Sequence, residues 1–75
     1  MFKKLKLKRA IEASKKRIAE LEQKRTRSQA ALIEAILNHT SPDDGDVDYF
    51  NMFTEQIEQE RANLHQLQAE LKELG

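Results

Sequence analysis

Apolar residues recur along this chain in alternating steps of four and three residues, in two long segments separated by a polar stretch. This 3.5-residue repeat is typical of helices that pack along a single seam. It predicts one helix over about 7–38, a turn over about 39–46 and a second helix over about 47–74. The first seam contains Leu7, Ile11, Ser14, Ile18, Leu21, Arg25, Ser28, Leu32 and Ala35, and the second contains Phe50, Phe53, Ile57, Glu60, Leu64, Leu67, Leu71 and Leu74.

The two seams match each other when they are paired in antiparallel order. Every rung then joins two residues whose numbers add to 85, so that Leu21 faces Leu64 and the charged Arg25 faces the charged Glu60. A constant sum is what two antiparallel helices joined by a turn produce, because one number rises as the other falls. The sequence therefore predicts an all-α protein, a two-helix antiparallel coiled-coil hairpin, with Arg25 and Glu60 as its register pair.

Residues that flank the seams support the same pairing. Antiparallel helices bring equivalent flanking positions together, and no like-charged pair results. The predicted pairs are Glu22 with Arg61, Arg17 with Glu70, and Ile36 with Val47.

The turn contains residues that favour a helix start. Ser41 is a good N-cap and Pro42 suits a first helical position, whereas Gly45 interrupts a helix. We expect one helical turn over 41–45, a break near Gly45, and then the second long helix.

The N-terminal segment has no partner in this register. Leu7 would need a residue at position 78, which lies past the end of the 75-residue chain. We therefore expect residues 1–10 to form a basic overhang, with the hairpin over 11–75. Five cations make this overhang a candidate contact for a polyanion: Lys3, Lys4, Lys6, Lys8 and Arg9.

Some apolar residues near the turn fall outside the seam. A two-helix hairpin buries only one stripe of each helix, so a partner usually completes its core. These residues form the predicted partner interface: Ala30, Ile33, Leu37 and Met52.

Charge is unevenly distributed although the formal net charge is zero. Residues 1–40 contain 11 Lys/Arg and 4 Asp/Glu, whereas residues 41–75 contain 2 Lys/Arg and 9 Asp/Glu. One interpretation is that a basic helix and an acidic helix attract each other within the hairpin. The alternative is a basic face over residues 1–17 that binds nucleic acid.

No pattern in the sequence indicates catalysis, a cofactor site or a metal site. Cysteine is absent, and no nucleophile elbow, phosphate loop or dinucleotide fingerprint occurs. His39 and His65 are not brought together by the predicted register. Four acids have the spacing of a calcium-binding EF-hand loop: Asp44, Asp46, Asp48 and Glu55. However, the sixth position of such a loop needs glycine, and here it is Tyr49.

Targeting signals are also lacking. No apolar run approaches the ~18 to 20 residues of a membrane span, so membrane association is not expected. The N-terminus has positive charge without the apolar region of a secretory signal, so we expect a cytoplasmic protein.

Together these features predict a non-enzymatic protein–protein interaction or assembly module. It would form a homo-oligomer or dock onto a larger protein. The alternative is a small nucleic-acid-binding accessory protein that uses its basic N-terminal segment.

Overall fold

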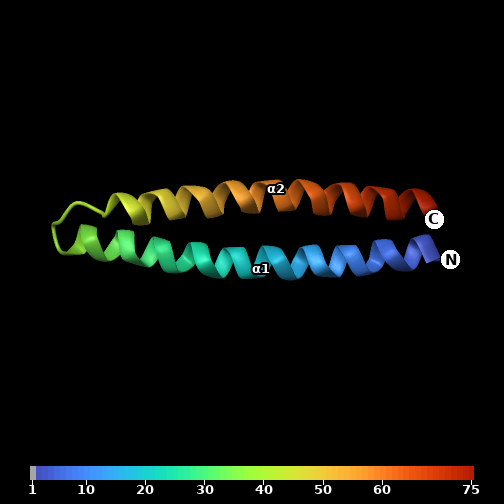
Figure 1. Cartoon of the computed structure of the whole chain (residues 1–75), viewed down its shortest axis with the longest axis horizontal. Helices are drawn as coiled ribbons and strands as arrows, with labels where there is room; N and C mark the ends of the chain where they lie inside the picture. Colours follow the sequence, from blue (N-terminus) through green and yellow to red (C-terminus); the bar gives the residue numbers. More distant parts are fainter. Residues whose placement is uncertain (1) are drawn as a thin grey trace.

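The computed structural model describes residues 2–75 and consists of two α-helices, α1 (Phe2–Leu37) and α2 (Asp44–Leu74). The helices run antiparallel along each other, and both chain ends lie at the same end of the molecule (Figure 1). The hairpin measures 57 × 15 × 14 Å. The predicted all-α hairpin is therefore confirmed, and residues 2–75 contain no strand. Met1, part of the predicted overhang, lies outside the described residues.

We call the end with both termini the open end and the other the loop end. At the loop end α1 stops in a reversal centred on His39, whose φ of 56° is left-handed. The Thr40 N–H donates to the Ala35 carbonyl at 2.9 Å, and the His39 N–H donates to the Ile36 carbonyl at 3.1 Å. This is the Schellman arrangement, which satisfies carbonyls that the helix end leaves free and normally uses glycine at the left-handed position.

Helix α2 begins at a different residue from the one we expected. Asp43 has an extended backbone (φ −65°, ψ 134°), and its carboxylate accepts a hydrogen bond from the Gly45 N–H at 3.3 Å. Asp43 is therefore the N-cap, and α2 continues through Gly45 without the predicted break. The cap satisfies a first-turn N–H, which favours a helix start three residues earlier than predicted.

Burial is concentrated toward the open end. Ile57 is fully buried, at 0% exposure, and the other buried residues all belong to the first 21 residues of the chain. Toward the loop end the seam residues of both helices are only half-buried. The buried members of the core are Leu7, Ile11, Ser14, Ile18, Leu21 and Ile57.

Three contacts between the helices define their register. Ser14 Oγ lies 2.8 Å from Glu60 Oε1, Arg17 Nε lies 3.4 Å from Glu60 Oε2, and Arg61 Nη2 lies 2.7 Å from Glu22 Oε1. The residue numbers in these three pairs add to 74, 77 and 83, with a mean of 78. This mean is one heptad below the predicted sum of 85. The Glu22–Arg61 pair is confirmed, whereas Arg17 pairs with Glu60 and not with Glu70.

The predicted register pair is consequently wrong. Glu60 contacts Ser14 and Arg17, while Arg25 is half-buried and joins no ion pair within residues 2–75. A shift of one heptad keeps every seam position on the seam, so the apolar pattern cannot distinguish the two registers.

The shift also removes the predicted overhang. Leu7 is only 8% exposed, α1 already begins at Phe2, and its N-terminus lies beside the C-terminus of α2 (Figure 1). In the observed register Leu21 lies about level with Ile57, and both are buried, at 6% and 0% exposure. Burying a large apolar side chain is worth about 1.5–3 kcal/mol, which favours this arrangement of the seam.

Candidate interaction surfaces

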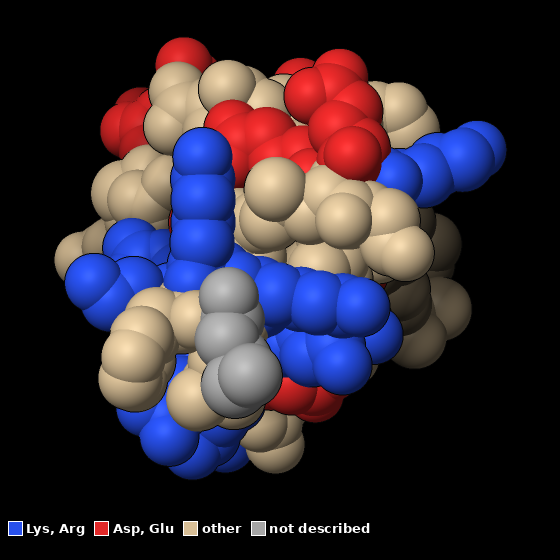
Figure 2. All heavy atoms as spheres, turned by 90° about the vertical axis from the view of Figure 1, so that its right-hand side faces the viewer, with Lys and Arg blue, Asp and Glu red and all other residues tan. Residues whose placement is uncertain are grey.

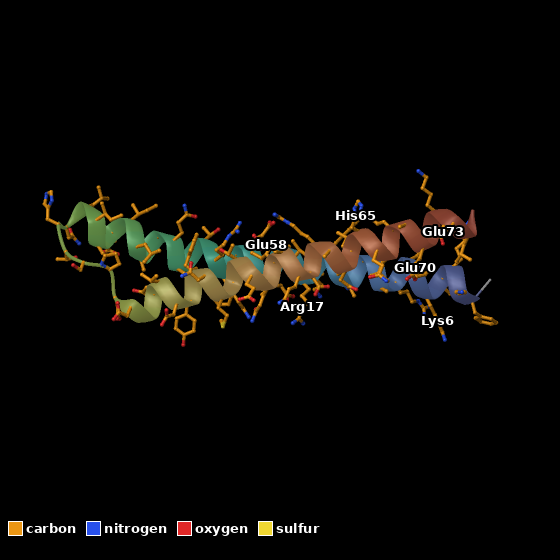
Figure 3. All side chains as sticks on the ribbon, turned by 90° about the horizontal axis from the view of Figure 1, so that it is seen from above. Lys6, Arg17, Glu58, His65, Glu70 and Glu73 are labelled. Carbon is orange, nitrogen blue, oxygen red and sulfur yellow. The ribbon has the colours of Figure 1, made fainter. Side chains whose placement is uncertain are left out.

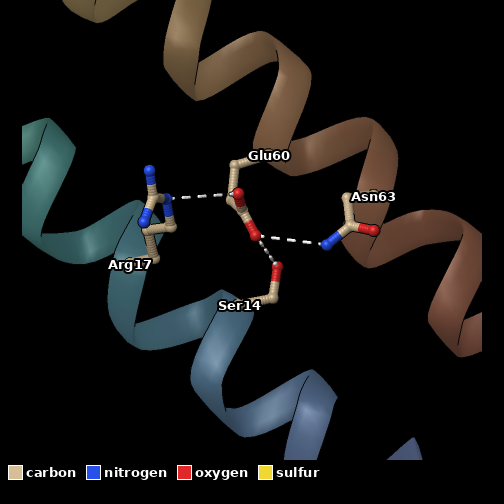
Figure 4. A network of polar contacts seen from close by, with 4 residues as sticks. All are labelled: Ser14, Arg17, Glu60 and Asn63. Carbon is tan, nitrogen blue, oxygen red and sulfur yellow. Dashed lines mark hydrogen bonds and ion pairs between the residues drawn. The ribbon is translucent and has the colours of Figure 1, made fainter.

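A polar cluster links the helices near the middle of the hairpin (Figure 4). The Glu60 side chain is 19% exposed, and its Oε1 accepts hydrogen bonds from Ser14 Oγ and from Asn63 Nδ2, the latter at 3.2 Å. Arg17 lies on its other oxygen, Oε2. Because each polar group in the cluster has a partner, it stabilises the contact between the helices, and we assign it a structural role.

Large apolar side chains are exposed at the loop end. Leu37 is 72% exposed, Ile36 63% and Ile33 48%, and residues at the start of α2 are exposed as well. All four predicted interface residues are exposed in a single copy of the chain, as they must be if they are to contact a partner: Ala30, Ile33, Leu37 and Met52. We call the following set the loop-end apolar residues: Ile33, Ile36, Leu37, Val47, Tyr49 and Met52.

Three of these residues were missed in the sequence. The sequence pattern predicts Ile36 and Val47 as a flanking pair, and it marks Tyr49 only as the residue that does not fit a calcium loop. The signal that could have identified them is the density of apolar residues on both sides of the turn, which exceeds what one seam uses.

The exposed residues of α2 surround a small hollow. Gly45, Asp48, Tyr49 and Met52 line a depression of about 260 Å³. The ring of Tyr49 stacks on Phe53 with centroids 6.1 Å apart and planes at 18°, so its position is supported by the seam. This part of the surface combines apolar side chains with a carboxylate.

The predicted polyanion contacts lie on the first turns of α1. All five (Lys3, Lys4, Lys6, Lys8 and Arg9) are exposed, and none joins an ion pair in the part of the chain that the structure describes. Figure 2 shows basic side chains gathered over α1 at the open end, with acidic ones over α2. Lys6 points away from both helices (Figure 3). These cations are therefore free to meet an external anion.

An open groove of about 590 Å³ lies between the helices at the same end. Its lining includes the apolar Ile11 and Leu71 together with three lysines, Lys8, Lys15 and Lys72. Lys15 lies 3.6 Å from a carboxylate oxygen of its own helix, on Glu12, which also lines the groove with Gln68. A groove with apolar residues and a net positive rim suits an occupant that is both apolar and acidic.

Opposite charges are concentrated at opposite ends of the hairpin. Residues 1–19, which we call the basic quarter, contain eight Lys/Arg and one Asp/Glu. Residues 41–59, the acidic quarter, contain six Asp/Glu and no Lys/Arg. The quarters lie on different helices, and from a rise of 1.5 Å per residue their centres are roughly 30 Å apart along the axis. That distance exceeds the Debye length of about 8 Å at physiological salt, so the two quarters do not neutralise each other within one copy.

Cross-helix ion pairs agree with this arrangement. Within residues 2–75 there are two, Arg17–Glu60 and Glu22–Arg61, and both lie near the middle of the hairpin. The predicted attraction between a basic and an acidic helix is thus limited to the middle.

Over residues 2–75 no three His, Cys, Asp or Glu side chains are grouped so that they could hold a metal ion. Neither of the two described helices has an apolar stretch long enough to cross a membrane. Comparison of the chain with models of protein families, with curated proteins and with solved structures gave no match.

Proposed function

We propose that this chain is a cytoplasmic, non-enzymatic assembly module, a coiled-coil hairpin that self-associates through its loop-end apolar residues. The observation that carries the proposal is the uneven core. Four of the six buried residues lie in the open-end half of the hairpin (residues 1–19 and 60–75), whereas the loop-end half (20–59) combines a largely half-buried seam with exposed Leu37, Ile36 and Ile33. A second chain that covered these residues would complete the core where the hairpin alone leaves it incomplete.

Substitution of two loop-end apolar residues tests this proposal. Ile33→Lys with Leu37→Lys should reduce the mass of the oligomer in light scattering, because lysines cannot be buried there without a partner. Helicity by circular dichroism should persist, since both side chains are exposed in one copy. A matched control, Gln23→Lys with Gln29→Lys, adds the same charges to exposed positions of the same helix and should leave the mass unchanged.

The mass of the wild-type protein alone can refute self-association. If its mass is that of one chain at the highest concentration reached, self-association is refuted, because mass action favours the oligomer there.

A second candidate function, nucleic-acid binding, is favoured by the exposed cations of the basic quarter. Binding to phosphates would weaken with salt, with a slope of log K against log salt of about −0.9 for each phosphate neutralised on duplex DNA. Deletion of the N-terminal part of the basic quarter is a poor test of this binding, because it would also remove the buried Leu7 from the core. Lys3→Gln, Lys4→Gln and Lys6→Gln are the better test: they should flatten the slope while the melting temperature stays constant. Failure of the wild-type protein to bind DNA or RNA at low salt would end this candidate.

A further inference from the structure

We infer that two copies of this chain pair side by side in opposite directions, so that the basic quarter of each copy lies against the acidic loop end of the other. The inference rests on the proposed self-association and adds the occupant and its orientation. It follows from three properties of the described residues: the charge at each end, the apolar side chains exposed at each end, and the symmetry of the contact.

Charge gives the orientation. Divided at the middle of each helix, the open-end half (1–19 and 60–75) contains ten Lys/Arg and four Asp/Glu. The loop-end half (20–59) contains three Lys/Arg and nine Asp/Glu. A parallel pair would place like charges together at both ends, which costs several kcal/mol in interfaces and opposes association. An antiparallel pair brings each basic half against an acidic one.

Apolar surface is present at both ends, as this pairing needs. At the open end Phe2 is 82% exposed and Leu5 45% exposed, and both lie among the lysines of α1. At the loop end Tyr49 and Met52 are exposed beside Asp48. Each surface therefore combines apolar side chains with charges of one sign, and the signs are opposite.

The lysine-lined groove at the open end of one copy is where the loop end of the other copy would bind. The half-buried Leu71 offers apolar surface to side chains of the loop end, while Lys8 and Lys15 face its carboxylates. The start of α2 suits this groove because it carries exposed apolar residues and no cation between residues 41 and 59.

Symmetry closes the assembly. A two-fold axis across the middle of the hairpin repeats the same contact twice, once at each end of the 57 Å molecule. An end-to-end contact between the same surfaces would instead leave one basic and one acidic end free and would form chains of unlimited length. The side-by-side pair uses all four surfaces and stops at two copies.

Two charge-reversed variants provide the test. The first variant carries Lys8→Glu and Lys15→Glu, on the groove, and the second carries Asp48→Lys and Glu55→Lys, near the loop. Each variant alone places two like charges at each contact and lowers the magnitude of the net charge of its quarter, so sedimentation equilibrium should show dimerisation weakened by at least about tenfold. Mixed in equal amounts, the two variants restore opposite charges at both contacts and should form a dimer containing one copy of each.

A matched control separates this effect from a general loss of charge or helix. Glu20→Lys with Lys24→Glu reverses two exposed charges of the same helix that lie outside both quarters and do not line the groove, and it should dimerise as the wild type does. Circular dichroism of all variants should show the same helicity.

Orientation is measured separately with a spin label. The chain has no cysteine, so His39→Cys at the loop takes a single label in each copy. Distances in the dimer by pulsed electron resonance should correspond to labels near opposite ends of the molecule. Labels found close together indicate a parallel pair and overturn the inference.

The outcomes also distinguish this inference from the proposed function. If the wild type is a dimer and the Lys8→Glu, Lys15→Glu variant still dimerises alone, self-association stands and the antiparallel pairing is refuted. A wild-type protein that stays monomeric and binds nucleic acid overturns both.

Discussion

The hydrogen bond between Ser14 and Glu60 offers the sharpest test of the observed register. Ser14 is 3% exposed, and its hydroxyl donates to the Glu60 carboxylate over 2.8 Å. We predict that Ser14→Ala lowers the free energy of unfolding, because the carboxylate stays partly buried with one donor fewer.

The magnitude follows from the surroundings of the carboxylate. A hydrogen bond to a charged group contributes about 1.5–3 kcal/mol, and the lower end applies because Glu60 keeps Asn63 and Arg17. Alanine regains about 0.5 kcal/mol through its higher helix propensity. The expected loss is about 1–1.5 kcal/mol, which for a chain of this size lowers the melting temperature by roughly 5–10 °C.

A double-mutant cycle isolates the bond. Ser14→Ala, Glu60→Ala and the double variant are melted at one fixed protein concentration, since self-association would make stability depend on concentration. We expect a coupling energy of about 1 kcal/mol between the two positions. As a control, the cycle of Arg25→Ala with Glu60→Ala should show no coupling.

The register described above would be refuted by the opposite pattern. In the pairing whose numbers add to 85, Glu60 faces Arg25 and Ser14 faces Leu71. That register predicts coupling between Arg25 and Glu60 and additive effects, within about 0.5 kcal/mol, for Ser14 and Glu60.

Four further predictions concern single residues, each read out by thermal or urea unfolding. His39→Gly should raise stability by roughly 0.5–1 kcal/mol, because glycine adopts the left-handed φ of 56° without steric cost; a loss would show that the His39 side chain stabilises the turn. Gly45→Ala should also stabilise by about 0.5–1 kcal/mol, since the nearest atoms to an added Cβ are 4.0 Å away in the first turn of α2; destabilisation would contradict the continuous helix there. Arg25→Leu should leave stability unchanged or raise it, whereas a loss of more than about 1 kcal/mol would point to a buried ionic partner. Ile57→Ala should cost about 2–5 kcal/mol through the cavity it leaves, and a smaller effect would mean that this position is not the centre of the core.

The candidate surfaces were predictable to different degrees. Exposure of Ile33 and Leu37 could be predicted because they fall outside the heptad stripe, and helix geometry alone places such residues on the outer face. Exposure of Ile36 and Val47 depended on how far the helices overlap at the loop, which the stripe does not specify. The groove beside Lys8 and Lys15 could not be predicted either, because the expected register left Lys8 without a neighbour and placed Ile11 opposite Leu74.

The sequence by itself determined the two helices, their antiparallel order and the residues of each seam, because these depend on a repeat that is local in the chain. The tertiary structure decided the register, that is, which heptad of α1 packs against which heptad of α2. A seven-residue shift preserves the apolar pattern, and the exposed ion pairs that favour one register contribute only about 0.2–1 kcal/mol each. Only packing in three dimensions could therefore bury Leu7 and Ile57 and bring Glu60 to Ser14. The separation of the basic quarter from the acidic one along the hairpin holds in either register, because residues 1–19 lie far from the turn and residues 41–59 directly follow its start. The register decided only which of their charges lie close enough to pair, as Arg17 and Glu60 do.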